Sequence, residues 1–253
     1  MQALLLAEDW PRLADWFEKA PPKVQRQYYE YRLQALNRSQ RWARLAAVCK
    51  TLTPQLEGKA KPRLGTYRLY RAQALSQLGR HQEAMAVHAE NGRLGQPEGY
   101  ANACVEARLA GNWGALLTHS GAILARKPED AEALGWKGEA LARLGRFDES
   151  AAVLRTAVKA NPKAAYAWNN LGRGALQRKA WDEAKESFDR ALALEPGQME
   201  ALFNRGIAQF NLKQYAASRD DFRAALALRP GDPVLKENLR QAEKMVAAYP
   251  QKP

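Results

Sequence analysis

The feature that most constrains the fold of this chain is a proline that returns every 34 residues. Pro128, Pro162, Pro196 and Pro230 stand at this spacing. Glycine, alanine, aromatic and large apolar residues form further columns with the same step. In that order, these columns are Gly138, Gly172 and Gly206; Ala157, Ala191 and Ala225; Trp113, Phe147, Trp181 and Tyr215; and Leu154, Phe188 and Phe222. Columns that stay in register over several units indicate a repeat protein, in which each unit packs mainly against its neighbours.

One repeat unit reads as two amphipathic helices. Residues 165–178 and 182–195 each place small or apolar residues on one side at helical spacing. We expect Gly172 to let the two helices approach closely and Phe188 to fill the space between helices. Pro196 then ends the second helix, because proline lacks a backbone N–H and disfavours helical geometry in the residue before it.

The recurring residues resemble those of the tetratricopeptide repeat (TPR) family. The residues that carry the resemblance within one 34-residue period are Trp168, Leu171, Gly172, Ala184, Phe188, Ala191 and Pro196. The resemblance implies an all-α fold, a right-handed α-solenoid of stacked antiparallel helix pairs. We expect about six such pairs, followed by a C-terminal capping helix.

The match to the repeat pattern varies along the chain and divides it into four parts. These parts are degenerate, basic helical repeats over 1–64, two divergent TPR-like repeats over 65–130, three clear TPR repeats over 131–231, and a capping helix and tail over 232–253. Residues 233–248 have one apolar and one charged face, which is typical of a terminal helix that shields the last repeat from water.

The family resemblance also implies where a ligand binds, because the first helix of each TPR pair lines a concave groove. The candidate peptide-binding residues on these helices are Asn102, Trp136, Glu139, Tyr166, Asn170, Arg173, Phe203, Asn204 and Ile207. Asn102, Asn170 and Asn204 occupy equivalent positions, and asparagine amides can hold a peptide backbone through both donors and acceptors. The alternative is that the asparagines bond within their own helix pairs and the aromatic residues pack against neighbouring helices.

The residues on the concave face also indicate the charge of the ligand. TPR proteins that bind heat-shock chaperones hold a C-terminal carboxylate in a basic clamp, and the clamp positions here are Gly135, Glu139, Asn170, Glu200 and Asn204. Only Asn170 suits a carboxylate, so a chaperone clamp is disfavoured. Although Arg143 also faces the groove, the acidic residues along it favour a basic or neutral peptide.

Positive charge is concentrated near the N-terminus. The chain has a net charge of +12, and residues 19–63 hold 11 Lys and Arg against 2 Asp and Glu. A local basic surface attracts acidic partners, so we expect a second, acidic partner at Arg38, Arg41 and Arg44. The alternatives are a basic face that serves solvation alone and a nucleic-acid surface. Nucleic acid is the less favoured, because the basic residues follow no recognised nucleic-acid-binding motif.

Nothing in the sequence favours an enzyme, so we expect no catalytic residues, no cofactor and no metal site. The three histidines, His81, His88 and His119, have no Ser/Cys–His–Asp pattern near them. Cys49 and Cys104 form no cluster with zinc-binding spacing. Cys104 falls in the small-residue column, where we expect a buried packing role.

The leading function hypothesis is a non-catalytic adaptor that binds a protein or peptide segment in the groove. The rival is a scaffold domain of a larger enzyme or of a secretion or assembly complex. No apolar stretch approaches the length of a membrane-spanning helix, and the N-terminus shows no secretory signal, so the expected location is the cytoplasm. The Ala-, Leu- and Arg-rich composition suggests a bacterial source, and the oligomeric state is left open.

Overall fold

The computed structural model describes residues 1–56, 61–96 and 98–249, and the chain divides into two compact units, 1–119 and 120–253. Unit 1 contains α1 (Gln2–Leu6), α2 (Trp10–Lys19), α3 (Pro22–Gln27), α4 (Tyr29–Arg38), α5 (Trp42–Leu56), α6 (Lys61–Gln77), α7 (His81–Arg93), α8 (Gly99–Leu109) and the first part of α9 (Trp113–Leu124). Unit 2 contains the rest of α9, α10 (Ala131–Arg143), α11 (Phe147–Ala160), α12 (Ala165–Gln177), α13 (Trp181–Leu194), α14 (Met199–Asn211), α15 (Tyr215–Leu228) and α16 (Pro233–Ala248).

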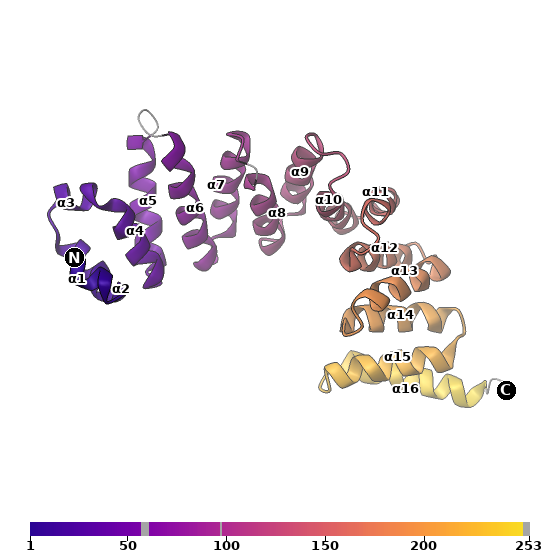
Figure 1. Cartoon of the computed structure of the whole chain (residues 1–253). Helices are drawn as coiled ribbons and strands as arrows, with labels where there is room; N and C mark the ends of the chain where they lie inside the picture. The colour runs from indigo at the N-terminus through magenta and orange to yellow at the C-terminus, as the bar shows by residue number, and fades with distance from the viewer. Residues whose placement is uncertain (57–60, 97, 250–253) are drawn as a thin grey trace. The chain divides into compact units, whose positions relative to one another are not determined.

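The predicted all-α stack of helix pairs is confirmed. From α4 to α8 and from α10 to α16, consecutive helices pack on one another, and Figure 1 shows the helices of each unit following one another in chain order. The helices expected over 165–178 and 182–195 are α12 and α13, whose ends lie within one residue of the expected bounds. In the part of the chain that the structure describes, no strand is present and no helix is long and apolar enough to cross a membrane.

The turn between the two helices of a pair contains a residue in the left-handed backbone region. Gly145 has φ of 77°, and Lys179 and Lys213, at the next two 34-residue steps, have φ of 58° and 61°. Directly after Gly145, the N–H of Arg146 donates to the Leu141 carbonyl at 2.9 Å. This bond satisfies a carbonyl that the end of α10 leaves without a helical partner. The same turn therefore recurs in each repeat, whether glycine or lysine occupies it.

The column of glycines faces a column of large side chains in the same repeat. A Cβ atom added to Gly172 in α12 would lie 2.8 Å from the ring of Phe188 in α13. A Cβ atom on Gly206 in α14 would lie 2.7 Å from the ring of Phe222 in α15. Both rings are fully buried. The close approach expected at Gly172 is thus a contact between a helix backbone and an aromatic ring.

The other aromatic column lies at the starts of the second helices. Trp113, Phe147, Trp181 and Tyr215 are the first residues of α9, α11, α13 and α15, and each is only half-buried. Their position at the turn into the second helix leaves one side of each ring accessible to solvent.

The last helix, α16, covers the end of unit 2 over the residues predicted for it. Asp232 begins this helix by accepting hydrogen bonds from the N–H groups of Val234 at 2.9 Å and Leu235 at 3.2 Å. Leu235 and Ala242 are buried against the preceding repeat, whereas the Val234 side chain is 56% exposed. An apolar side chain therefore stays accessible where α16 starts.

In unit 1, a histidine takes the position that phenylalanine takes in later repeats. His88 follows Ala84 by four residues in α7, as Phe188 follows Ala184 in α13. The His88 side chain is buried, and its Nδ1 has no hydrogen-bond partner. Burial lowers the pKa of His88 below its ordinary 6.5, and the nearby Glu106 only partly opposes this effect. The core of unit 1 therefore accommodates the neutral imidazole.

We expect unit 1 to lose stability as the pH falls below about 6.5. The unfolded chain takes up a proton at His88 near this pH, whereas the folded protein takes it up only at a lower pH. The unfolded state therefore binds more protons, and the free energy of unfolding decreases as the pH is lowered. Because burial also lowers the pKa of His119, that residue adds to the effect.

Urea unfolding followed by far-UV circular dichroism, at about pH 7.5, 6.5 and 5.5, measures this loss. His88→Phe is the informative variant, because it removes the titrating group and keeps an aromatic ring at the site. Wild type should lose more stability between the two ends of this range than His88→Phe. Equal losses in the two proteins would show that His88 does not cause the pH dependence.

Candidate functional site

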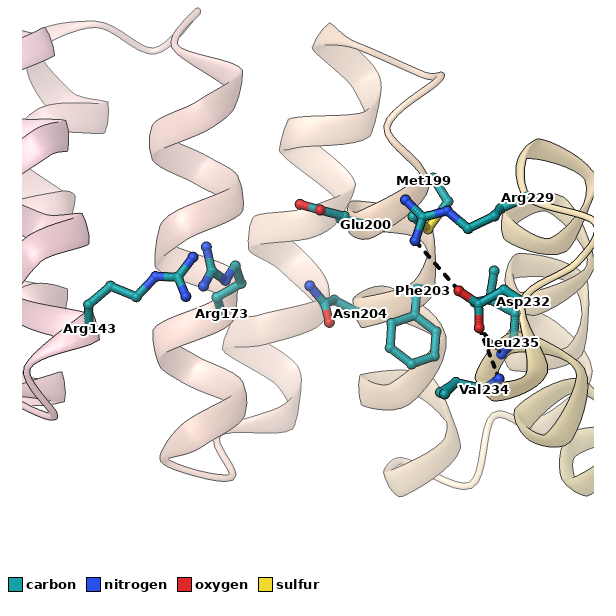
Figure 2. Close-up of a pocket in the computed structure, with 10 residues that line it drawn as sticks. All are labelled: Arg143, Arg173, Met199, Glu200, Phe203, Asn204, Arg229, Asp232, Val234 and Leu235. Carbon is teal, nitrogen blue, oxygen red and sulfur yellow. Dashed lines mark hydrogen bonds and ion pairs between the residues drawn. The ribbon is translucent and has the colours of Figure 1, made fainter. Parts of the chain in front are cut away.

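Unit 2 contains an open hollow between the first helices of its helix pairs and the start of α16. Its volume is about 390 Å³. Figure 2 shows side chains from α10, α12, α14 and the turn into α16 around one space. The residues that line it are Arg143, Arg173, Met199, Glu200, Phe203, Asn204, Arg229, Asp232, Val234 and Leu235. Side chains that are far apart in the sequence meet here because each comes from an equivalent helix of a successive repeat.

One edge of the hollow is cationic. Arg143 ends α10 and Arg173 lies in the middle of α12, and Figure 2 shows their guanidinium groups facing each other. Arg173 Nη1 donates to the Asn170 Oδ1 at 3.4 Å. Burial lowers the pKa of Arg173, Arg143 lowers it further, and the carboxylates of Glu139 and Glu200 act in the opposite direction. The positive charge of Arg173 is therefore held in surroundings that only partly compensate it.

The opposite edge is apolar and is supported by the start of α16. The ring of Phe203 packs against Phe222, with 5.8 Å between ring centroids, and remains half-buried. Leu235 and Val234 also line this edge, and Leu235 is buried whereas Val234 is exposed. This edge offers carbon surface to a ligand, next to the guanidinium groups.

The carboxylate of Asp232 also lies at this apolar edge, but it is already used within the protein. Asp232 accepts the two backbone hydrogen bonds that begin α16, and Arg229 lies 3.5 Å from it. These backbone bonds and Arg229 hold the pKa of Asp232 below its ordinary value. Asp232 therefore shapes the end of the hollow and is not a free acceptor for a ligand.

The structure brings together some of the candidate binding residues and separates others. Arg173, Phe203 and Asn204 line the hollow, and Asn170 adjoins it through its hydrogen bond to Arg173. Ile207 is half-buried in α14 and is not among the lining residues. Asn102 lies in α8 of unit 1, so its predicted alignment with Asn170 and Asn204 stays a prediction.

Three candidates on α10 and α12 are engaged within the protein. Trp136 and Glu139 are buried, with 8% and 9% of their surfaces exposed. The Tyr166 ring lies over Gly135, where an added Cβ would be only 2.2 Å from it, and its hydroxyl donates to the Ala131 carbonyl at 2.9 Å. Burial raises the pKa of Tyr166 to about 12. Tyr166 thus packs against α10, but 40% of its surface is exposed, and its role in peptide binding stays a prediction.

Two of the three basic residues predicted to contact an acidic partner are already in ion pairs. Arg41 lies 2.6 Å from Asp15, and Arg44 donates to both carboxylate oxygens of Glu18 at 2.9 and 2.7 Å. Arg38 is exposed at the end of α4. Two carboxylates of α2 therefore balance a small part of the positive charge counted over 19–63, and part of that stretch, 57–60, lies outside the described residues.

The cysteines take packing positions. Cys49 and Cys104 are both fully buried. Burial raises the pKa of the Cys49 thiol to about 12, so this residue is not poised to act as a thiolate. Within the described ranges, no group of three or more His, Cys, Asp or Glu side chains could hold a metal ion.

Most of the lining residues that the sequence did not indicate lie in the turn between α15 and α16 or in the first turn of α16. Arg229, Asp232, Val234 and Leu235 complete the hollow, but this segment was expected only to cap the last repeat. The available signal was Asp232 followed by proline, a combination typical of a helix start. This signal fixes where α16 begins. It therefore also decides which side chains face α14, the first helix of the last helix pair.

Comparisons with known proteins agree with this architecture. Family models described as tetratricopeptide repeat match residues 171–247, 120–165 and 143–184. These matches together cover 120–247, about half of the chain. No curated protein sequence matches the chain.

Solved structures of MamA have a similar fold. A MamA RS-1 ArsTM double mutant is 19% identical, with a TM-score of 0.58 over 67% of this chain and 97% of that chain. The structure titled MamA MSR-1 C2 is also 19% identical, with a TM-score of 0.54 over 60% of this chain and 88% of that chain. At such identities the likeness concerns the fold alone. The repeat columns, the stacked helix pairs and the family matches lead to one conclusion: this chain belongs to the tetratricopeptide repeat family.

Proposed function

We propose that this chain is a non-catalytic adaptor that binds a segment of a partner protein on the first helices of unit 2. TPR repeats are typically protein-interaction modules without catalytic activity, and this supports the general class. The observation that carries the proposal is the hollow of about 390 Å³, which collects side chains from α10, α12, α14 and α16. A segment of a few residues fits such a hollow.

The chemistry of the hollow suits a peptide. Phe203 and Val234 offer apolar surface, and burial of rigid apolar groups supplies most of the energy at protein interfaces. The Asn204 amide is half-buried at the centre of the hollow, where it can both donate to and accept from a peptide backbone. The guanidinium groups at the other edge add directional donors.

A library of random dodecapeptides displayed on phage tests the proposal, because it offers the hollow many different segments at once. Peptides selected by wild-type protein are synthesised with a fluorescent label, and their dissociation constants are measured by anisotropy. The variant Asn204→Ala/Val234→Ser alters the hollow. The control variant Asn211→Ala/Leu228→Ser changes the same residue classes at exposed positions outside it.

We expect the hollow variant to weaken binding by about tenfold or more, since it removes an amide and an apolar contact. The control variant should bind within about twofold of wild type. Failure to select any peptide, or equal binding by all three proteins, would overturn the proposal.

A further inference from the structure

The cationic edge of the hollow contains an arginine without a carboxylate partner. Among the residues that the structure describes, no Asp or Glu oxygen lies within ion-pair distance of the Arg173 guanidinium, whose contact is the neutral Asn170 Oδ1 at 3.4 Å. Two other half-buried arginines of unit 2 do have such partners. Arg205 lies 2.7 Å from Asp221, and Arg178 lies 2.8 Å from Glu183.

The neighbours of Arg173 make this arrangement unusual. Arg143, from the preceding repeat, faces it at the same edge of the hollow, so two positive charges lie next to each other there. Glu200 projects into the same space from α14 without forming an ion pair with Arg173, and Glu139 is buried in α10. Burial and the charge of Arg143 together lower the pKa of Arg173. A negative charge placed between the two guanidinium groups would offset their mutual repulsion and compensate the cost of burying Arg173.

We propose that the partner segment is acidic, and that one of its Asp or Glu carboxylates binds between Arg143 and Arg173. A neighbouring apolar side chain of the segment then packs on Phe203 and Val234 at the opposite edge. Guanidinium groups suit this role because their planar donors match the two oxygens of a carboxylate. The inference rests on the proposed function and replaces the expectation, drawn from acidic residues along the groove, of a basic or neutral ligand.

The test uses the same random dodecapeptide library on the whole chain. The site variant Arg143→Gln/Arg173→Gln removes the two facing charges. The control variant Lys159→Gln/Arg190→Gln removes two positive charges from exposed positions on α11 and α13, the second helices of the same repeats. This control separates a specific site from the general attraction of acidic peptides to a chain with a net charge of +12. Circular dichroism confirms that each variant remains helical.

We expect wild type and the control variant to select peptides with Asp or Glu at one fixed distance from an apolar residue. For a selected peptide, changing that acid to its amide should weaken binding to wild type about 10- to 100-fold, the range of a charge-assisted hydrogen bond. The site variant should bind the acid and the amide forms equally.

Four outcomes would overturn the inference. Peptides that depend on Asn204 and Val234 but show no acidic preference would overturn it and leave the proposed function standing. An acidic preference that survives in the site variant, or disappears equally in the control variant, would also overturn it. The third is binding of a thymidine dodecanucleotide that requires Arg143 and Arg173 while acidic peptides fail to bind, because the site would then recognise phosphate. A library that yields no bound peptide overturns the proposed function and this inference together.

Discussion

Replacing Gly172 by leucine should lower the free energy of unfolding of unit 2 by about 3 kcal/mol. An added Cβ at this position lies 2.8 Å from the Phe188 ring, and the remaining leucine atoms have to occupy space that the ring already fills. The ring is fully buried, so it cannot move aside into solvent. The gain in helix propensity on replacing glycine, up to about 1 kcal/mol, offsets only part of this cost.

Gly174 provides a matched control two residues further along α12. A Cβ added there meets no atom within 4 Å. Gly174→Ala should therefore raise stability by about 0.5–1 kcal/mol, because it improves helix propensity without a clash. Urea unfolding by circular dichroism gives the global values. Hydrogen exchange in α12 and α13 gives the free energy of local opening. The local value matters because repeat arrays can unfold in steps. An unchanged midpoint for Gly172→Leu would contradict the packing described here.

The fold could be predicted from the sequence because the repeats have the same internal contacts. Gly172 meets Phe188 and Gly206 meets Phe222 at the same separation along the chain, so a contact that one repeat requires appears as a column in the sequence. In unit 1 the signal weakens because other residues fill the same positions. His88, for example, stands where a phenylalanine would identify the repeat.

The candidate site could be predicted only in part, because the sequence gives the face of a helix but not its neighbours. Arg173, Phe203 and Asn204 line the hollow, and their role in peptide binding stays a prediction. Trp136 is on the expected helix, but surrounding side chains bury it, and no spacing along α10 reveals this. The contribution of the turn into α16 depends on how α15 packs between α14 and α16, which only the three-dimensional structure shows.

The charge of the N-terminal segment illustrates a different limit. A count over 19–63 assigns a strong positive charge to these residues, yet the partners of Arg41 and Arg44 are Asp15 and Glu18, just before the counted window. The two residues of each ion pair are distant in the sequence. A charge count over one window of the chain can therefore include one partner and leave out the other. The surface field depends on the charges that are close in space.

The second large effect is expected at Arg205, which links two successive repeats. Its Nε and Nη2 donate to both oxygens of Asp221 at 2.7 Å, and its Nη1 donates to Asp189 at 2.7 Å. These residues lie on α14, α15 and α13, so one guanidinium joins three helices. Asp221 is 7% exposed, and a carboxylate that loses its partner at such a position keeps the cost of burial without the compensating bonds.

Arg205→Met should therefore destabilise unit 2 by about 2–3 kcal/mol, somewhat less than the loss of a fully buried partner because 22% of the Arg205 side chain is exposed. The double variant Arg205→Met/Asp221→Asn should recover part of this loss, since the buried charge is then absent. The exposed pair of Arg240 with Glu237 has the same two-bond geometry, and Arg240→Met should leave the unfolding midpoint close to that of wild type. A double-mutant cycle in urea measures the coupling. If Arg205→Met and Arg240→Met have equally small effects, the ion pairs of Arg205 contribute no more stability than a surface ion pair. Packing of buried residues such as Phe188 and Phe222 then holds the repeats together without these ion pairs.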